Sequence, residues 1–127
     1  MNKNIVATIV LLVLDVLWVT LYMRNAYKKQ AQDIQGTQMK SRVYLGAIAY
    51  ILMVVGLNMF VLPNIRKGHE LIDSLKYGAT FGLVVYGIYD MTAAAVFKDW
   101  DLKLATVDII WGSFVFFISA YVGSKLG

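Results

Sequence analysis

Residues 43–62 read VYLGAIAYILMVVGLNMFVL, a run of 20 residues without a charged side chain. About 20 apolar residues form a helix long enough to cross the hydrocarbon core of a bilayer. Three further runs of similar length, each with one acidic residue, lie at 5–23, 77–97 and 104–122. All four runs are continuously apolar rather than alternating, which favours helices over the strands of a membrane barrel. The sequence therefore predicts an all-α, integral membrane four-helix bundle with short links.

The composition favours a single membrane domain that covers residues 1–127. Hydrophobic residues make up 59% of the chain and charged residues 16%, against about 45–50% and about 25% in soluble domains. A soluble domain of 127 residues buries too little of its chain to hide so much apolar surface. The same content argues against a nucleic-acid partner, despite the formal net charge of +4. The absence of cysteine excludes a disulfide framework and a thiolate metal site.

The orientation in the membrane is predicted from the Lys and Arg residues of the links. The links at 24–42 and 98–103 lie on one side and hold 7 basic residues, whereas the termini and the link at 63–76 hold 5. Cytoplasmic loops carry the excess of Lys and Arg, and the cluster after the first span is the stronger signal. We therefore expect both termini outside the cytoplasm, while the small margin leaves dual insertion open.

Three of the 8 acidic residues lie inside predicted spans, namely Asp15, Asp90 and Asp108, whereas all 12 Lys and Arg lie outside them. A carboxylate at the centre of a bilayer costs about 2.5–3.5 kcal/mol and normally faces the interior of the bundle or a watery cavity. With no basic residue in the spans, each aspartate must be protonated, bonded by neutral donors or neutralised by a bound cation. Such residues indicate function by default.

Helix rise predicts that the three aspartates converge in the half of the bundle that carries the first and third links. Tyr and Trp side chains at helical spacing can donate hydrogen bonds to them. We therefore predict a proton, cation or small-solute site made of Asp15, Trp18, Tyr86, Tyr89, Asp90, Thr92, Asp108 and Trp111. The alternative is that each aspartate only bonds a neighbouring helix and fixes its register.

Two shorter patterns have simpler interpretations. Leu14-Asp15-Val16-Leu17-Trp18 resembles Val107-Asp108-Ile109-Ile110-Trp111, and we interpret the match as chemical similarity rather than as a proven repeat. Gly78-x-x-x-Gly82 is more simply a packing face within the chain than a homodimer seam. A metal is conceivable only through the three aspartates, whose oxygen atoms favour Mg²⁺ or Mn²⁺. No nucleotide or phosphate motif is present, so no cofactor is expected.

Several of these motifs together resemble a family of small bacterial membrane proteins known as domain of unknown function 2177. The residues that carry the resemblance are Tyr86-Gly87-x-Tyr89-Asp90-x-Thr92, Trp100, Asp108-x-x-Trp111-Gly112 and Asp15-x-x-Trp18. The likeness covers nearly the whole chain, although the residue after Thr92, often Asn in the family, is Ala93 here. It implies four spans, a location in the bacterial inner membrane and the importance of these positions. It implies no activity, because the family has none assigned.

The function predicted first is the binding or transport of a proton, a cation or a small cationic solute. Four spans with an acidic residue in the first are also similar to the small multidrug-resistance transporters. Those proteins use Glu, and they show that so short a chain can transport as a homodimer. A structural or accessory membrane subunit is the second hypothesis, and a membrane-embedded lipid-processing enzyme is the third. We therefore favour a transporter over an enzyme.

Overall fold

The computed structural model describes residues 2–18, 43–97 and 100–126, and this part of the chain is helical without strands. The elements are α1 (Lys3–Trp18), α3 (Val43–Gly56), the π-helical η2 (Leu57–Val61), the 3-10 turn η3 (Leu62–Asn64), α4 (Glu70–Asp73), the π-helical η4 (Ser74–Ala79), α5 (Thr80–Val96) and α6 (Leu102–Leu126). The all-α bundle predicted from the apolar runs is therefore confirmed.

Three continuous helices are long and apolar enough to cross a membrane: Gly46–Asn64, Glu70–Val96 and Leu102–Leu126. The last two extend beyond the predicted spans at 77–97 and 104–122, because apolarity marks the hydrocarbon core while a helix continues into the polar interface. The described part of the first span is α1, and the predicted remainder at 19–23 lies outside the described residues.

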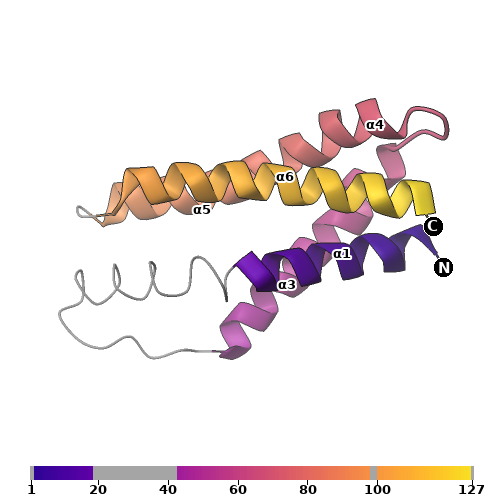
Figure 1. Cartoon of the computed structure of the whole chain (residues 1–127). Coiled ribbons are helices and arrows are strands. Elements are labelled where there is room, and N and C mark those ends of the chain that lie inside the picture. Colours follow the sequence, from indigo (N-terminus) through magenta and orange to yellow (C-terminus); the bar gives the residue numbers. More distant parts are fainter. Residues whose placement is uncertain (1, 19–42, 98–99, 127) are drawn as a thin grey trace.

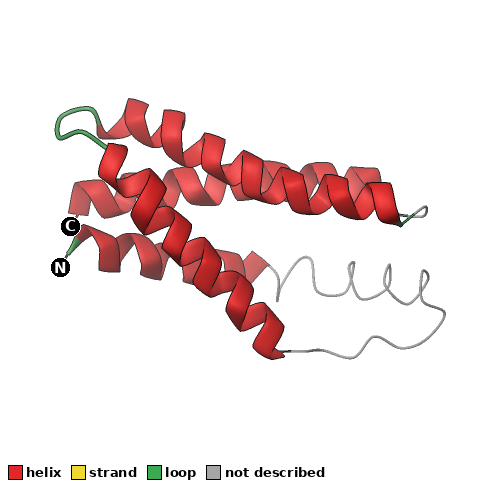
Figure 2. Cartoon of the chain, turned by 180° about the vertical axis from the view of Figure 1, so that it is seen from behind, coloured by secondary structure: helices red, strands yellow, loops and turns green. Residues whose placement is uncertain are grey.

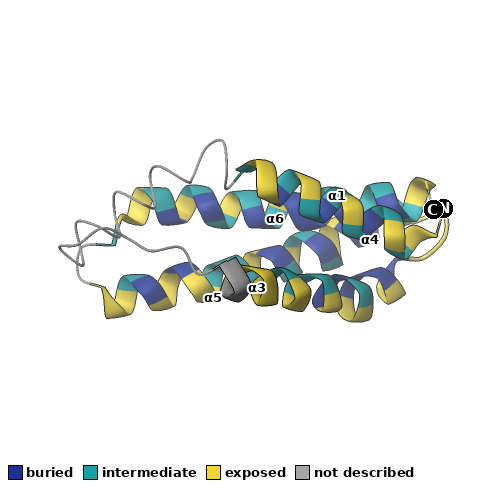
Figure 3. Cartoon of the chain, turned by 90° about the horizontal axis from the view of Figure 1, so that it is seen from below, coloured by how far each residue is buried: buried dark blue, intermediate teal, exposed yellow. Residues whose placement is uncertain are grey.

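Three helices have roughly parallel axes and the fourth crosses them. In Figure 1, α6 lies between α1 and α5, and both termini lie at the same end as the turn before α4. Helix α3 crosses this group obliquely, as the view from behind shows (Figure 2). Buried and exposed residues alternate along the helices (Figure 3). Large exposed apolar residues such as Ile51, Ile88 and Ile110 fit a surface that faces lipid.

Glycines set the closest helix contacts. A Cβ atom on Gly82 of α5 would lie 2.1 Å from the carbonyl oxygen of Gly112 on α6, and one on Gly78 would lie 2.9 Å from that of Phe116. Small residues let helix backbones approach to this degree. The Gly78–Gly82 pair therefore packs within the chain, as predicted. Gly123 of α6 similarly faces Ala7 of α1.

The turn before α4 is held by an ion pair. Asp73 is buried, and it accepts hydrogen bonds from the backbone N–H of Arg66 at 2.9 Å and from its Nε and Nη2 at 2.9 and 3.0 Å. These bonds to the carboxylate raise the pKa of the Arg66 guanidinium, so the arginine stays charged. Two parallel bonds to one carboxylate also fix the orientation of the guanidinium, which ties the turn to the start of the helix Glu70–Val96.

Candidate functional site

Asp15 lies on the inner face of α1, where Ala7, Leu11 and Asp15 recur every four residues and are all buried. The hydroxyl of Tyr86 on α5 donates a hydrogen bond to its Oδ1, and the indole Nε1 of Trp111 on α6 donates another at 3.1 Å. One carboxylate oxygen thus joins three helices through neutral donors.

A third aromatic group near this aspartate comes from α3. The phenol of Tyr50 interacts electrostatically with the Asp15 carboxylate. All four long helices therefore contribute to the surroundings of Asp15. A buried carboxylate without a basic partner needs several such interactions to offset its desolvation.

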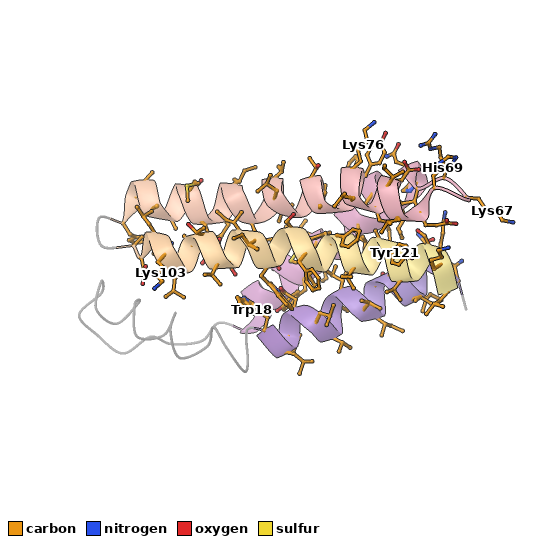
Figure 4. The ribbon with its side chains drawn as sticks, turned by 45° about the horizontal axis from the view of Figure 1, so that its top comes forward. Trp18, Lys67, His69, Lys76, Lys103 and Tyr121 are labelled. Carbon is orange, nitrogen blue, oxygen red and sulfur yellow. The ribbon has the colours of Figure 1, made fainter. Side chains whose placement is uncertain are left out.

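Asp108 has a matching arrangement on α6. It is buried, and its Oδ1 accepts a hydrogen bond from the indole Nε1 of Trp18 on α1 at 3.3 Å. Figure 4 shows Trp18 at the end of α1, beside α6. The rings of Trp18 and Trp111 stack, with centroids 4.6 Å apart and planes 8° apart. Each tryptophan thus donates to the aspartate of the other helix.

This reciprocal arrangement gives the sequence match between the first and last spans a structural meaning. Helices α1 and α6 run in opposite directions (Figure 1), so residue 15 lies opposite 111 and residue 18 opposite 108. Two copies of Asp-x-x-Trp on antiparallel helices produce two equivalent Asp–Trp pairs around a local two-fold axis. The interpretation as chemical similarity alone missed this pairing.

Gly112 makes room for the Tyr86 ring at the centre of the site. A Cβ atom on Gly112 would lie 2.1 Å from Cγ of Tyr86 and 2.2 Å from its Cδ1. No side chain could be accommodated there without moving the ring. The glycine after Trp111 therefore sets the position from which the Tyr86 hydroxyl reaches Asp15.

A cavity of about 600 Å³ adjoins both aspartates. Its walls come from α1, α3, α5 and α6 and are mainly apolar and aromatic. The lining residues are Asp15, Trp18, Gly46, Ala49, Tyr50, Leu52, Met53, Phe81, Val85, Tyr86, Tyr89 and Asp108. The arrangement places two acidic groups at the wall of a chamber large enough for a small organic molecule.

The structure brings together most of the predicted site residues but not all of them. Asp15, Trp18, Tyr86, Tyr89 and Asp108 line the cavity, and Trp111 bonds to Asp15. Thr92 is exposed on α5 and does not line the cavity.

The predicted convergence of three aspartates stays a prediction for Asp90. This residue is fully buried on α5 but is absent from the cavity wall. In the described part of the chain, no group of three or more His, Asp or Glu side chains could hold a metal ion. Helix rise fixes the depth of a residue but not what it packs against, and Asp90 is buried on α5 without lining the cavity.

The sequence analysis missed Tyr50, which lies in the one predicted span without an acidic residue. The signal was present, since a tyrosine well inside an apolar run needs a partner for its hydroxyl. Phe81 and Met53, which also line the cavity, carry no such signal. They resemble any other apolar residue of a membrane helix.

The fold and the site define a helical membrane protein with two carboxylates buried among aromatic donors. A family model described as "Predicted membrane protein (DUF2177)" matches residues 2–125. Because the match covers nearly the whole chain, the protein belongs to this family, as the resemblance implied. Neither a curated protein nor a solved structure matched the chain.

Proposed function

We propose that the protein binds a cation within the membrane at Asp15 and Asp108 and exchanges it for a proton during transport. The observation that supports this most is the cavity of about 600 Å³ whose wall contains both carboxylates. A tightly packed bundle would have left these groups no access to a solute. Here both aspartates are buried, yet each contributes to the cavity wall.

Charge balance explains why exchange is favoured. The apolar spans contain no Lys or Arg, so a proton or a bound cation has to neutralise the carboxylates when water is excluded. A monovalent cation that enters the site displaces one proton, and the proton returns when the cation leaves. This cycle keeps the charge of the site constant and couples the two movements.

The proposed setting is the bacterial inner membrane, with both termini outside the cytoplasm. The cavity then opens in the cytoplasmic half of the bundle, which carries the basic links at 24–42 and 98–103. A chain of 127 residues is expected to transport as a homodimer, which light scattering on the purified protein would test.

The test is proton exchange in liposomes that contain the purified protein and a pH-sensitive dye. Adding Na⁺, K⁺, tetramethylammonium or methyltriphenylphosphonium outside should raise the internal pH for at least one cation, beyond protein-free liposomes. Asp15→Asn and Asp108→Asn should abolish that response. Asp90→Asn is the matched control, because it alters a buried aspartate outside the cavity wall. Equal responses from protein-containing and empty liposomes with every cation would refute transport.

A structural or accessory role is the second candidate, and the reciprocal Asp–Trp bonds favour it. A hydrogen bond between membrane helices stabilises their packing by about 0.6 kcal/mol on average and by about 1.7 kcal/mol at most. Such bonds are sufficient to fix the register of one helix against another. In that case Asp15→Asn would lower stability without changing any flux. Within the described residues, no contact favours the third candidate, a lipid-processing enzyme: their share of the cavity wall offers carboxyl, phenol and indole groups but no His, Cys, Lys or Ser.

A further inference from the structure

We infer that the solute is a monovalent organic cation with a bulky apolar or aromatic body, rather than a metal ion or a proton alone. This inference rests on the proposed binding site at Asp15 and Asp108 and names the chemical class of its ligand. Three properties of the cavity carry it: the chemistry of its walls, the number of its oxygen ligands and its size.

Aromatic side chains make up much of the cavity wall. They come from three helices, α1, α3 and α5: Trp18, Tyr50, Phe81, Tyr86 and Tyr89. The faces of aromatic rings attract organic cations, and desolvated contacts of this kind are worth about 2 kcal/mol or more. The same rings, with Leu52 and Met53, bind apolar substituents. The wall therefore complements both parts of an amphiphilic cation.

The oxygen ligands are too few for a divalent metal. Ca²⁺ takes about six to eight oxygen ligands and Mg²⁺ needs near-octahedral geometry. Among residues 2–18, 43–97 and 100–126, Asp15 and Asp108 are the two that offer carboxylates to the cavity, and no larger acidic group occurs there. Part of the Asp15 carboxylate is also engaged by Tyr86 and Trp111. An organic cation, whose positive charge is diffuse, needs no complete shell of oxygen ligands. The carboxylate oxygens that remain available are therefore sufficient for it.

The volume of the cavity indicates how large the apolar part of the organic cation is. Its volume of about 600 Å³ falls within the range of about 300–1,000 Å³ that is typical of sites for drug-sized molecules. A bare Na⁺ ion or a proton would leave most of the apolar wall without a partner. An organic cation with several ring or alkyl groups buries this wall and places its charge against the aspartates.

Calorimetric titration of the full chain in detergent micelles tests the inference with four probes, after subtraction of empty micelles. Methyltriphenylphosphonium carries both the charge and the apolar body. Triphenylphosphine oxide keeps the body without the charge, tetramethylammonium keeps the charge with a small body, and Mg²⁺ is a divalent metal. Since each 1.4 kcal/mol corresponds to about a tenfold change in affinity, methyltriphenylphosphonium should bind at least about tenfold more tightly than each of the other three.

Variants locate that binding in the cavity. Asp15→Asn should weaken the binding of methyltriphenylphosphonium by about tenfold or more. Tyr89→Leu removes a partly exposed aromatic ring from the cavity wall and should weaken the binding by about threefold to tenfold. Asp90→Asn should leave the affinity within about threefold of the wild type, in keeping with its place outside the wall. The comparison of the four probes needs only the wild-type protein, so it decides even where Asp15→Asn does not fold.

The possible results separate the two proposals. Equal binding of triphenylphosphine oxide would show that the aspartates are not used, and equal binding of tetramethylammonium or Mg²⁺ would show that the aromatic wall is not used; either overturns the inference. Proton exchange with Na⁺ or K⁺ but no organic cation binding would overturn it while leaving the proposed transport intact. Tight, Asp15-dependent binding without any exchange would support the inferred ligand class and refute transport.

Discussion

Trp18 and Trp111 stack face to face between α1 and α6, and each donates its indole N–H to the aspartate of the opposite helix. The two hydrogen bonds and the stack share the same two rings, so they form one unit. Stacked aromatic pairs contribute about 0.5–1.5 kcal/mol beyond the area that they bury. This unit therefore both orients Asp15 and Asp108 and joins the first helix to the last.

The first prediction is that the two tryptophans act together. Trp111→Phe keeps a ring in the stack but removes the N–H that Asp15 accepts, and Trp18→Phe does the same for Asp108. Each change should lower the free energy of unfolding by about 0.6–1.7 kcal/mol, the range of hydrogen bonds between membrane helices. Unfolding in detergent mixtures would measure it.

The double variant provides the control for this prediction. Because the rings touch, the combined effect should differ from the sum of the single effects by at least about 0.5 kcal/mol. Ile110→Val on the exposed face of α6 should change stability by less than about 0.5 kcal/mol. Strict additivity of the two Trp→Phe changes would mean that they do not form one unit.

The second prediction concerns the contact between α5 and α6. Gly82→Ala should destabilise the fold by about 1–3 kcal/mol, because the new methyl group would meet the backbone of Gly112 at 2.1 Å. Gly87→Ala on the same helix is the matched control, since nothing lies within 4 Å of its Cβ position. That change should be neutral or stabilising by up to about 1 kcal/mol through helix propensity. A tolerated Gly82→Ala would contradict the close helix contact.

The apolar runs were sufficient to predict the helices, because lipid leaves a backbone few other ways to satisfy its polar groups. They could not predict that α3 crosses the other helices obliquely, since a uniformly apolar helix does not show which face packs. For the same reason the sequence could not show whether Asp90 lines the cavity. Tyr50 was identified only once α3 was placed beside α1.

The third prediction tests the orientation of the protein in the membrane. Because the chain contains no cysteine, a maleimide would label only the cysteine that a substitution introduces. Lys67 and Lys103 are exposed at opposite ends of the molecule, as Figure 4 shows. With both termini outside the cytoplasm, Lys67→Cys should react with a membrane-impermeant maleimide in intact cells. Lys103→Cys should react only after the membrane is permeabilised. Equal labelling of both variants in intact cells would instead indicate dual insertion.

The fourth prediction is that cation affinity rises with pH. Asp15 faces the phenols of Tyr50 and Tyr86, the indole of Trp111 and the carboxyl group of Asp108. Among groups of these kinds only a carboxylate loses its negative charge when it binds a proton, and a neutral carboxyl group does not attract a cation. Bound cation and proton therefore compete, so over the range in which one proton is displaced the affinity should change by about tenfold per pH unit.

Calorimetric titration with methyltriphenylphosphonium across a series of pH values measures this slope. Replacing both aspartates by asparagine removes the groups that titrate in the cavity, so the double variant should show weak binding that does not depend on pH. Asp90→Asn should retain the slope, because Asp90 is not part of the cavity wall. If the slope persisted in the double variant but vanished in Asp90→Asn, the competing proton would bind at Asp90, and the coupling assigned to Asp15 and Asp108 would be wrong.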